Sequence, residues 1–549
     1  MKAKSMKKAL AAVLTASMLL GLTACGGSKT SEGPELTKAE DIDSAVPSWT
    51  KHTDNDTELE WYINASWMTG TWGEDWNSAY MKEKTGFNLK VSAPSGNEAE
   101  KLNTMMASGD MPDIITLAWN EPQVAEMIDA GMIIPMNELA DNYDPYFYEV
   151  AKPDLLSWNT KDDGNFYGYN CFTTTPSDFE NGRDIYSNRS FLVRKDMWEA
   201  LGEPTFDTPE NFYNALVAAK EMFPTVNDGM SMIPLGAMEF TTTGSPSFDD
   251  FLADWLGIPY EKDGKLYDRK TDSEYIKWMK MFRQANEDGL ISKDIYIDKA
   301  GEQITEKFGQ GRYFCGFLQW VDFKAQQQIL TNIDPEGIYI GVEGPRNSNG
   351  NAPTLASGSI NGWLQTFITT DCENPQRAME FITYMVSPEG QKDQVCGEEG
   401  KMHDMVDGKA VYTDEFMALA NDPSSNYVAK TGYNFWSFFE DPGQSIQWLI
   451  PMSDSVNAMR GLAKEYATFT AVYEIPEFIP DSEEAVAKLK IDELWGKTQP
   501  ALLTAATEEE FDKILAEFVQ SRNDAGYDML MEAMNKQMES NKQKLGMNE

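Results

Sequence analysis

The sequence predicts an α/β fold organised as two lobes around a cleft. Its 549 residues exceed what one hydrophobic core usually holds, so at least two domains are expected. Hydrophobic residues make up 41% of the chain and aromatic residues 12%, which is enough to fill two such cores. Strand-like and helix-like segments alternate from about residue 57 onward, a pattern typical of open sheets with right-handed crossovers. We expect the chain to cross between the lobes several times and so to form a hinge.

The first 24 residues have the layout of a secretory signal peptide. A lysine-rich start is followed by an apolar run over residues 9–20, which is too short to span a bilayer. The four residues that end in Cys25 are Leu-Thr-Ala-Cys and resemble the lipobox of bacterial lipoproteins. That resemblance implies cleavage before Cys25, lipidation of this cysteine and a location on the extracellular face of the bacterial cytoplasmic membrane. The alternative is an ordinary signal peptide that is cleaved elsewhere.

Charge and composition exclude several functions. The formal net charge of −42 repels nucleic acid and anionic lipid surfaces, so neither is expected as a partner. Besides Cys25 the chain has four widely separated cysteines, which we expect to be mostly buried free thiols. It has only two histidines, which argues against a histidine-based metal site and against a Ser-His-Asp triad. We expect a monomer with no cofactor, no metal and no enzymatic activity.

The region after residue 57 predicts a sheet with two tryptophans at one edge. Strands are predicted at residues 59–64, 87–92 and 113–117, and helices at 76–85, 98–108 and 121–130. The uniformly apolar run at 113–117 is typical of a buried parallel strand. Trp67 and Trp119 both follow predicted strands. Ligands of open α/β sheets bind beyond the carboxyl ends of strands, so both positions are candidates for a binding site.

Two motifs resemble segments of a known family. Residues 107–114, Ala-Ser-Gly-Asp-Met-Pro-Asp-Ile, are similar to a turn of extracellular solute-binding proteins of the sugar-binding family 1 type, which are capture subunits of ABC importers. Residues 374–391 begin with Asn-Pro-Gln-Arg-Ala and end with Glu-Gly-Gln. They resemble a stretch of large lipoprotein binding proteins of the LplA-like or aldouronate type. The resemblance implies a two-lobed periplasmic-binding-protein-like fold, type II-like, and a role in ABC import.

The mature chain is expected to divide into a tether and two interleaved lobes. Residues 25–56 are rich in Gly, Ser, Thr and charged residues, which predicts a lipidated cysteine followed by a flexible spacer. The first lobe is expected to comprise residues 57–173 and 344–422. The second lobe is expected to comprise residues 174–343 and 423–549.

Tryptophans beside predicted strand ends are the candidate ligand-binding residues. Sugar rings present apolar C–H faces that stack on aromatic rings, while their hydroxyls bond polar side chains. The aromatic candidates are Trp67, Trp119, Trp320 and Trp363, and the polar candidates are Asn64, Asn120, Gln319 and Asp322. Any one of these tryptophans could equally be a core residue. Trp119 and Trp320 are favoured because their neighbours are polar and their strands end there.

The function that these observations favour is capture of a solute outside the membrane. We expect a membrane-anchored subunit that binds a sugar or oligosaccharide, which could contain a uronate, and delivers it to ABC permease subunits. Arg183, Arg189 or Arg346 could grip a uronate carboxylate, although a solvated surface role is expected for each. A surface glycoside hydrolase is one alternative, and it would need a pair of carboxylates across the scissile bond. A binder of peptide or another non-sugar solute on the same fold is the other.

Overall fold

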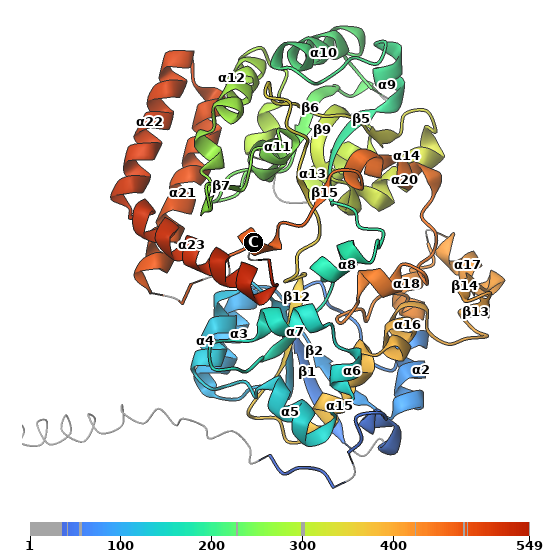
Figure 1. Cartoon of the computed structure of the whole chain (residues 1–549). Helices are drawn as coiled ribbons and strands as arrows, with labels where there is room; N and C mark the ends of the chain where they lie inside the picture. Colours follow the sequence, from blue (N-terminus) through green and yellow to red (C-terminus); the bar gives the residue numbers. More distant parts are fainter. Residues whose placement is uncertain are drawn as a thin grey trace, which may run out of the picture.

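The computed structural model shows two α/β lobes joined by several chain crossings (Figure 1). It describes residues 36–40, 42–53, 57–226, 229–297, 302–422, 424–475, 478–479 and 481–547. The predicted signal peptide and Cys25 lie outside the described residues. Each lobe is built on its own open sheet, as the predicted fold class requires.

The first lobe is organised around a five-stranded sheet with the order β2-β1-β3-β12-β4. These strands are β1 (Glu58–Ile63), β2 (Asn88–Ser92), β3 (Ile114–Ala118), β4 (Gly168–Asn170) and β12 (Leu364–Ile368). β1 pairs in parallel with β2 and β3, whereas β12 runs antiparallel to β3 and β4. The predicted apolar strand forms the centre, because β3 has β1 on one side and β12 on the other.

Helices cover both faces of this sheet, and local capping signals set their ends. The helices are α2 (Trp76–Thr85), α3 (Glu98–Ser108), α4 (Pro122–Asp129), α5 (Met136–Tyr143), α6 (Phe147–Val150), α7 (Pro153–Asn159), α15 (Pro375–Val386), α16 (Pro388–Cys396), α17 (Asp414–Ala420) and α18 (Tyr427–Thr431). Asp75 caps α2 by accepting a hydrogen bond from the Ser78 N–H, and Gly86 ends it with a φ of 73°. Asn374 caps α15 in the same way, by accepting a hydrogen bond from the Arg377 N–H. Residues 377–386 of α15 are all buried, so this helix forms a wall of the first core.

The second lobe has a four-stranded sheet with the order β10-β5-β9-β6. Its strands are β5 (Arg189–Arg194), β6 (Ile233–Ala237), β9 (Tyr313–Gln319) and β10 (Tyr339–Gly341). Its helices are α9 (Lys195–Ala200), α10 (Pro209–Met222), α11 (Asp250–Trp255), α12 (Ser273–Glu287), α13 (Glu302–Gly309), α14 (Lys324–Ile333), α20 (Asp454–Arg460), α21 (Glu483–Thr504), α22 (Glu508–Asp524) and α23 (Tyr527–Lys544). Aromatic side chains from β5, β9, α10 and α12 fill its core.

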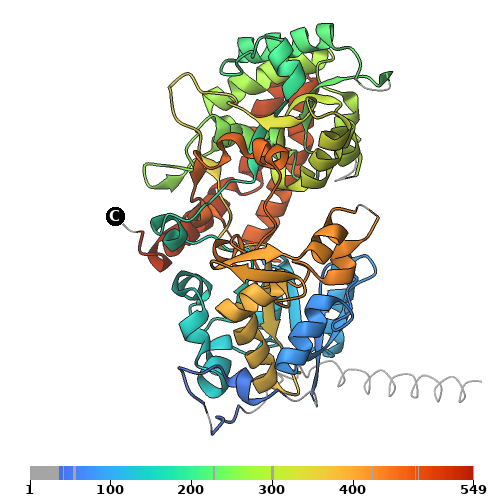
Figure 2. The same ribbon diagram turned by 90° about the vertical axis from the view of Figure 1, so that its right-hand side faces the viewer.

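The lobes are connected by crossings that lie side by side (Figure 2). One passes through α8 (Pro176–Glu180), and another leads from α19 (Pro442–Ser445) on the first lobe to α20 in the second. Between the lobes, β11 (Leu355–Ala356) pairs in parallel with β15 (Ala467–Thr468). The C-terminal helix α23 also spans the junction. Its Lys544 donates hydrogen bonds to the carbonyls of Trp158 and Thr160 in the first lobe, at 2.9 and 2.7 Å.

Two segments belong to a different lobe from the one expected. Residues 344–356 pack on the second lobe, where Asn347 bonds the Leu256 carbonyl and Leu355 enters the core. Residues 424–450 pack on the first lobe, because Trp436 and Phe439 fill its core and Trp448 packs beside Val395 of α16. The expected return to the second lobe therefore occurs later, near α20. Burial of these aromatic side chains is the physical reason for the difference.

The predicted flexible spacer is in part a docked segment. Residues 42–53 lie against the first lobe and include the short helix η1 (Ser48–Lys51). The Trp49 side chain is 5% exposed and packs edge-on against Tyr384 of α15, with ring centroids 5.0 Å apart. His52 Nδ1 lies 2.7 Å from the Glu380 carboxylate of the same helix. The spacer expected up to residue 56 therefore ends earlier, because Trp49 has a pocket to occupy.

Among the described residues, no helix combines the length and apolar character needed to cross a membrane.

The four cysteines of the described region, Cys171, Cys315, Cys372 and Cys396, are free and buried, as expected.

Candidate functional site

Strand register defines the edges at which the lobes face each other. In the first sheet, Leu364 at the start of β12 lies opposite Ala118 at the end of β3, which is parallel to β1. The carboxyl ends of β1 and β3 therefore share the edge from which the chain crosses to the second lobe. In the second sheet, Arg189 at the start of β5 lies opposite Gln319 at the end of β9. Residues that follow β1, β3 and β9, or precede β12, are thus placed at the junction of the lobes.

Three aromatic rings form a column at the edge of the first sheet. Trp67 follows β1, and its ring lies 5.6 Å from that of Trp363 with an interplanar angle of 19°. The Phe438 ring lies 6.1 Å from Trp67 at an angle of 6°. Phe438 is buried, whereas Trp67 is 48% and Trp363 is 46% exposed. We call Trp67, Trp363 and Phe438 the aromatic column; it presents two large apolar rings to solvent.

Exposure singles out the two tryptophans of the column. All 15 tryptophans of the chain lie among the described residues, and ten of them are buried. Trp67 and Trp363 are the two that the structure leaves well exposed. Adjacent exposed aromatic rings are costly in water and mark a surface that binds something. The column is therefore the best candidate for a ligand contact.

Trp119 and Asn120 lie next to the column. The Trp119 backbone N–H donates to the Trp363 carbonyl at 3.4 Å, so the two residues share one edge of the sheet. Trp119 is half-buried and Asn120 is exposed. Phe172, which follows β4, contributes a further ring at 6.3 Å from Trp363. Phe172 holds a left-handed φ of 56°, a strained conformation for such a residue that often occurs at functional sites.

Asn64 does not offer a free amide to a ligand. Its side chain accepts a hydrogen bond from the Tyr62 hydroxyl at 2.8 Å and donates one to Glu121 at 2.9 Å. It is 4% exposed, so its role is to orient the half-buried Glu121 carboxylate. Burial raises the pKa of Glu121, which is opposed by hydrogen bonds from Ala118 and Asn64.

The structure does not bring Trp320 to the exposed rings. Trp320 is 5% exposed, and its indole N–H donates to the Ser187 carbonyl at 2.8 Å. It packs in the second core, with the Arg460 guanidinium 4.9 Å from its ring. This residue was one of the two favoured tryptophans, and its placement is that of a core residue.

Asp322 and Lys324 do lie at the surface of the second lobe near this edge. Both side chains are exposed. Burial by surrounding protein and the charge of Glu239 raise the pKa of Asp322, while Lys324 opposes the rise. Burial and the charge of Arg460 lower the pKa of Lys324, while Glu440 and Asp322 oppose this. Asp322 and Lys324 are thus exposed polar groups with shifted pKa values that follow β9 at the junction of the lobes.

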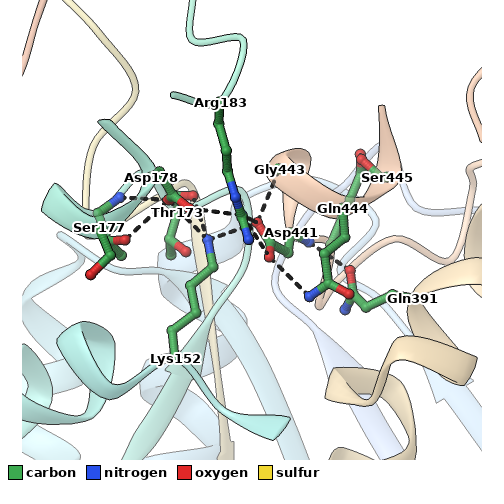
Figure 3. Close-up of polar contacts among 12 residues, drawn as sticks. Lys152, Thr173, Ser177, Asp178, Arg183, Gln391, Asp441, Gly443, Gln444 and Ser445 are labelled. Atoms are coloured by element: carbon green, nitrogen blue, oxygen red, sulfur yellow. Dashed lines mark hydrogen bonds and ion pairs between the residues drawn. The ribbon is translucent and has the colours of Figure 1, made fainter. Parts of the chain in front are cut away.

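A ring of alternating charges fixes two of the crossings beside the site (Figure 3). Lys152 lies 3.1 Å from Asp178 and 2.7 Å from Asp441. Arg183 lies 2.7 Å from Asp178 and 3.3 Å from Asp441. Burial alone would raise the pKa of Asp441, but Lys152, Gln444 and Arg183 lower it below its usual value. Arg183 is therefore engaged within the protein and is not a free uronate ligand.

The other two arginine candidates are also engaged. Arg189 bonds the buried Asp254 carboxylate, and Arg346 contacts Glu343 and the Tyr466 hydroxyl. Among the described residues, no group of three or more His, Cys, Asp or Glu side chains is placed to hold a metal ion.

Phe438 and Phe172 are residues of this site that were not among the candidates from the sequence. Phe438 belongs to a run of aromatic residues, Phe435 to Phe439, that could have been a core or a rim. Phe438 is part of the core and also of the site, because its buried ring stacks on the exposed ring of Trp67. No local signal marks Phe172.

Comparisons with known proteins agree with this architecture. A model of the family described as bacterial extracellular solute-binding protein matches residues 65–392. Lipoprotein LipO of Bacillus subtilis (strain 168) is 24% identical over 336 residues, which are 60% of this chain and 64% of LipO. The fructooligosaccharide ABC transporter substrate-binding protein FusA of Streptococcus pneumoniae serotype 4 is 26% identical over 337 residues, which are 58% of each protein. The match thus spans less than two thirds of the length of either relative.

Solved structures show the same fold over a larger part of the chain. The FusA EF-hand mutant of S. pneumoniae in complex with fructo-nystose has a TM-score of 0.67 at 17% identity, covering 88% of this chain and 99% of that one. The alginate-binding protein AlgQ2 without calcium ion has a TM-score of 0.62 at 19% identity, covering 88% and 98%. At these identities the likeness shows the fold alone. Because the family model matches more than half of the sequence and the two-lobed architecture agrees with it, the chain belongs to the family of bacterial extracellular solute-binding proteins.

Proposed function

We propose that this protein captures a sugar or oligosaccharide between its lobes and delivers it to the permease subunits of an ABC transporter. The observation that carries the proposal is the aromatic column, in which Trp67 and Trp363 expose stacked rings at the edge where the lobes meet. Apolar C–H faces of sugars stack on such rings. Asn120, Asp322 and Gln319 are polar groups near the same junction that can bond hydroxyls.

The names of the relatives support a saccharide as cargo. FusA, a relative by sequence, is named for fructooligosaccharides, and AlgQ2, a relative by fold, is named for alginate. A uronate-containing saccharide remains part of the proposal. Lys324 of the second lobe is the described cation that best fits this role, because it is exposed while Arg183, Arg189 and Arg346 are engaged.

We further propose that the protein is held at the extracellular face of the membrane through a lipid on Cys25 and works as a monomer without turning over its ligand. Ligand capture closes the lobes only if the ligand contacts both of them, since it must bind the closed state more tightly. The column of the first lobe and Asp322 or Lys324 of the second lobe are the contacts that we assign to this role.

Calorimetry on the mature chain with a panel of neutral and uronate-containing oligosaccharides tests the proposal. We expect saturable binding of one saccharide class and no products after prolonged incubation. Released products would contradict the binding role and favour a glycoside hydrolase. Binding of peptides and of no saccharide would contradict the assigned cargo.

A Lys324→Gln variant tests the uronate part separately. If the cargo carries a uronate, this variant should bind the charged saccharide more weakly and should bind its neutral analogue with unchanged affinity. Equal losses for both would remove Lys324 as the uronate contact.

A further inference from the structure

A second pocket lies away from the aromatic column and shares no residue with it. It has a volume of about 400 Å³, within the range of small-molecule sites. One wall comes from the second lobe around α11 and η4 (Arg269–Thr271), and another from one face of α23, with Tyr527, Met531 and Met534. Residues 470–474 of a crossing close it on the side of the first lobe.

Buried donors in this pocket lack partners. Arg269 donates to the buried Asp254 at 2.6 Å, but its Nε and Nη1 make no hydrogen bond although both atoms are buried. Arg522 donates to Asp268 at 2.5 Å and is 6% exposed, and its Nε has no partner either. Unpaired buried N–H groups are rare in folded proteins because each loses its hydration. Both guanidiniums lie at the wall of the pocket, and a small side-chain shift would expose these N–H groups to an occupant that brings oxygen acceptors.

The pocket also offers an acceptor at its mouth. The Asp250 side chain is 60% exposed and lies 4.0 Å from Arg189 and 3.7 Å from Arg269, beyond hydrogen-bond distance. Its carboxylate can therefore accept hydrogen bonds from an occupant. A fitting ligand must carry both donors and acceptors.

Aromatic and apolar surface completes the site. The Arg269 guanidinium lies 4.0 Å above the Tyr260 ring, which stacks on Tyr473 at 5.1 Å with an angle of 9°. Tyr473 is the last of these three stacked side chains and belongs to the crossing. Met531 and Met534 of α23 line the same pocket. Such a lining suits the C–H face of a ring.

Charge in the pocket is balanced, so a charged ligand has no advantage. The lining carries five cations, Arg189, Arg269, Lys270, Lys488 and Arg522, and five carboxylates, Asp249, Asp250, Asp268, Glu474 and Asp492. A neutral ring that carries hydroxyls supplies acceptors for the arginines, donors for Asp250 and an apolar face for Tyr473. We propose that this pocket is a second binding site, for a neutral saccharide of one or two rings, at a place separate from the aromatic column.

The site is built so that its occupant touches the hinge. Tyr473 lies in a crossing, and Asn541 of α23 donates to the carbonyls of Val472 and Glu474 at 3.1 Å. The last turn of the same helix bonds the first lobe through Lys544. An occupant is therefore coupled to the relative position of the lobes, and binding here and at the column should influence each other reciprocally.

The test uses the mature chain with Trp67→Ala and Trp363→Ala, which disables the column, and carbon-13-labelled methionine methyl groups. Neutral mono- and disaccharides are titrated, and the signals of Met531 and Met534 are assigned with Met→Leu variants. We expect these two signals to shift saturably. Asp250→Asn and Tyr473→Ala should each weaken the effect at least tenfold, whereas Asp528→Asn, an exposed acid on α23 outside the pocket, should not.

Two outcomes overturn the proposal. One is the absence of shifts at Met531 and Met534 with every saccharide at concentrations that approach solubility. The other is a response to amino acids or simple carboxylates in place of saccharides. The proposed function is tested separately. It predicts that the chain with an intact column binds an oligosaccharide and that Trp67→Ala with Trp363→Ala abolishes this binding. That result does not depend on the methionine signals.

Discussion

At the scale of single residues, the aromatic column depends on one buried ring and two exposed ones. Phe438 is fixed by the first core, where Trp61 contacts it edge-on at 5.2 Å. Trp67 and Trp363 then stack outward from it. The column is therefore in place before a ligand arrives, and its rings lose little freedom on binding.

Replacing Trp67 or Trp363 by alanine should weaken saccharide binding about tenfold or more, because a ring–ring stack contributes about 0.5–1.5 kcal/mol beyond the area that it buries. Each ring is about half exposed, so thermal stability should change little. Calorimetry and thermal melts on the same samples measure both effects. Tyr148→Ala, which removes a comparably exposed ring on α6, should leave affinity unchanged. Equal affinity in all three variants would place the ligand elsewhere.

Glu440, at the base of the site, gives the protein a dependence on pH. Burial raises its pKa to about 7, against hydrogen bonds from Ser445 and Ser437 and the charge of Lys324. The folded state thus holds a proton that the unfolded state releases at lower pH. The free energy of unfolding should therefore fall between about pH 4.5 and pH 7, by at most about 3 kcal/mol from this group.

Glu440→Gln should remove that part of the fall, because glutamine keeps an acceptor for Ser445 and carries no charge. Urea unfolding at several pH values measures it, with the exposed Glu415→Gln as control. Asp144, whose pKa burial raises to about 6, contributes a fall of the same sign at lower pH that stays in both variants. A pH profile that the substitution leaves unchanged would show that Glu440 is charged in the folded protein.

At the scale of elements, the docked segment of residues 42–53 is the clearest surprise. Ser48 donates to Asp144 at 3.2 Å and to the Tyr143 carbonyl at 3.0 Å, while Trp49 fills a pocket beside α15. These contacts join the segment before the first strand to two helices of the first lobe.

Trp49→Ala should destabilise the first lobe by about 2–4 kcal/mol, since it empties a buried aromatic pocket at the edge of the core. Limited proteolysis should then cut within residues 42–53 sooner than in the unsubstituted chain. Val46→Ala, in the same segment but 40% exposed, is the matched control and should have little effect. Cleavage at equal rates would mean that the segment is held by its hydrogen bonds alone.

The sequence predicted elements whose signals are local and missed placements that depend on distant partners. The helix expected at residues 76–85 is found there as α2, and the local residues Asp75 and Gly86 set its ends. Trp119 and Trp320 look alike in the sequence, since each follows a strand and has polar neighbours. Only the fold shows that the Trp320 indole turns back to Ser187 of a crossing, 133 positions away. The placement of residues 424–450 was missed for the same reason.

At the scale of the whole molecule, charge is the dominant global property. The net charge of −42 implies self-repulsion throughout the folded chain. The Debye length shortens from about 30 Å at 0.01 M salt to about 10 Å at 0.1 M, so added salt screens most of this repulsion.

The melting temperature should therefore rise by several degrees when sodium chloride is increased over that range. Scanning calorimetry of the mature chain measures the effect, and sucrose at matched osmolality controls for general exclusion from the surface. A falling melting temperature would show that the ion pairs, such as the ring of Lys152, Asp178, Arg183 and Asp441, outweigh the repulsion.

The docked N-terminal segment also decides how mechanical force would enter the molecule. Residues 42–53 lie on the side of the first lobe that is remote from the second lobe (Figure 1). With the anchor that we propose at Cys25, a pull from the membrane is transmitted through Trp49 and α15 into the first core. This force does not pass through the crossings, so movement of the anchor should not change the relative position of the lobes. We therefore expect the second lobe to move relative to the anchored first lobe when a ligand is captured.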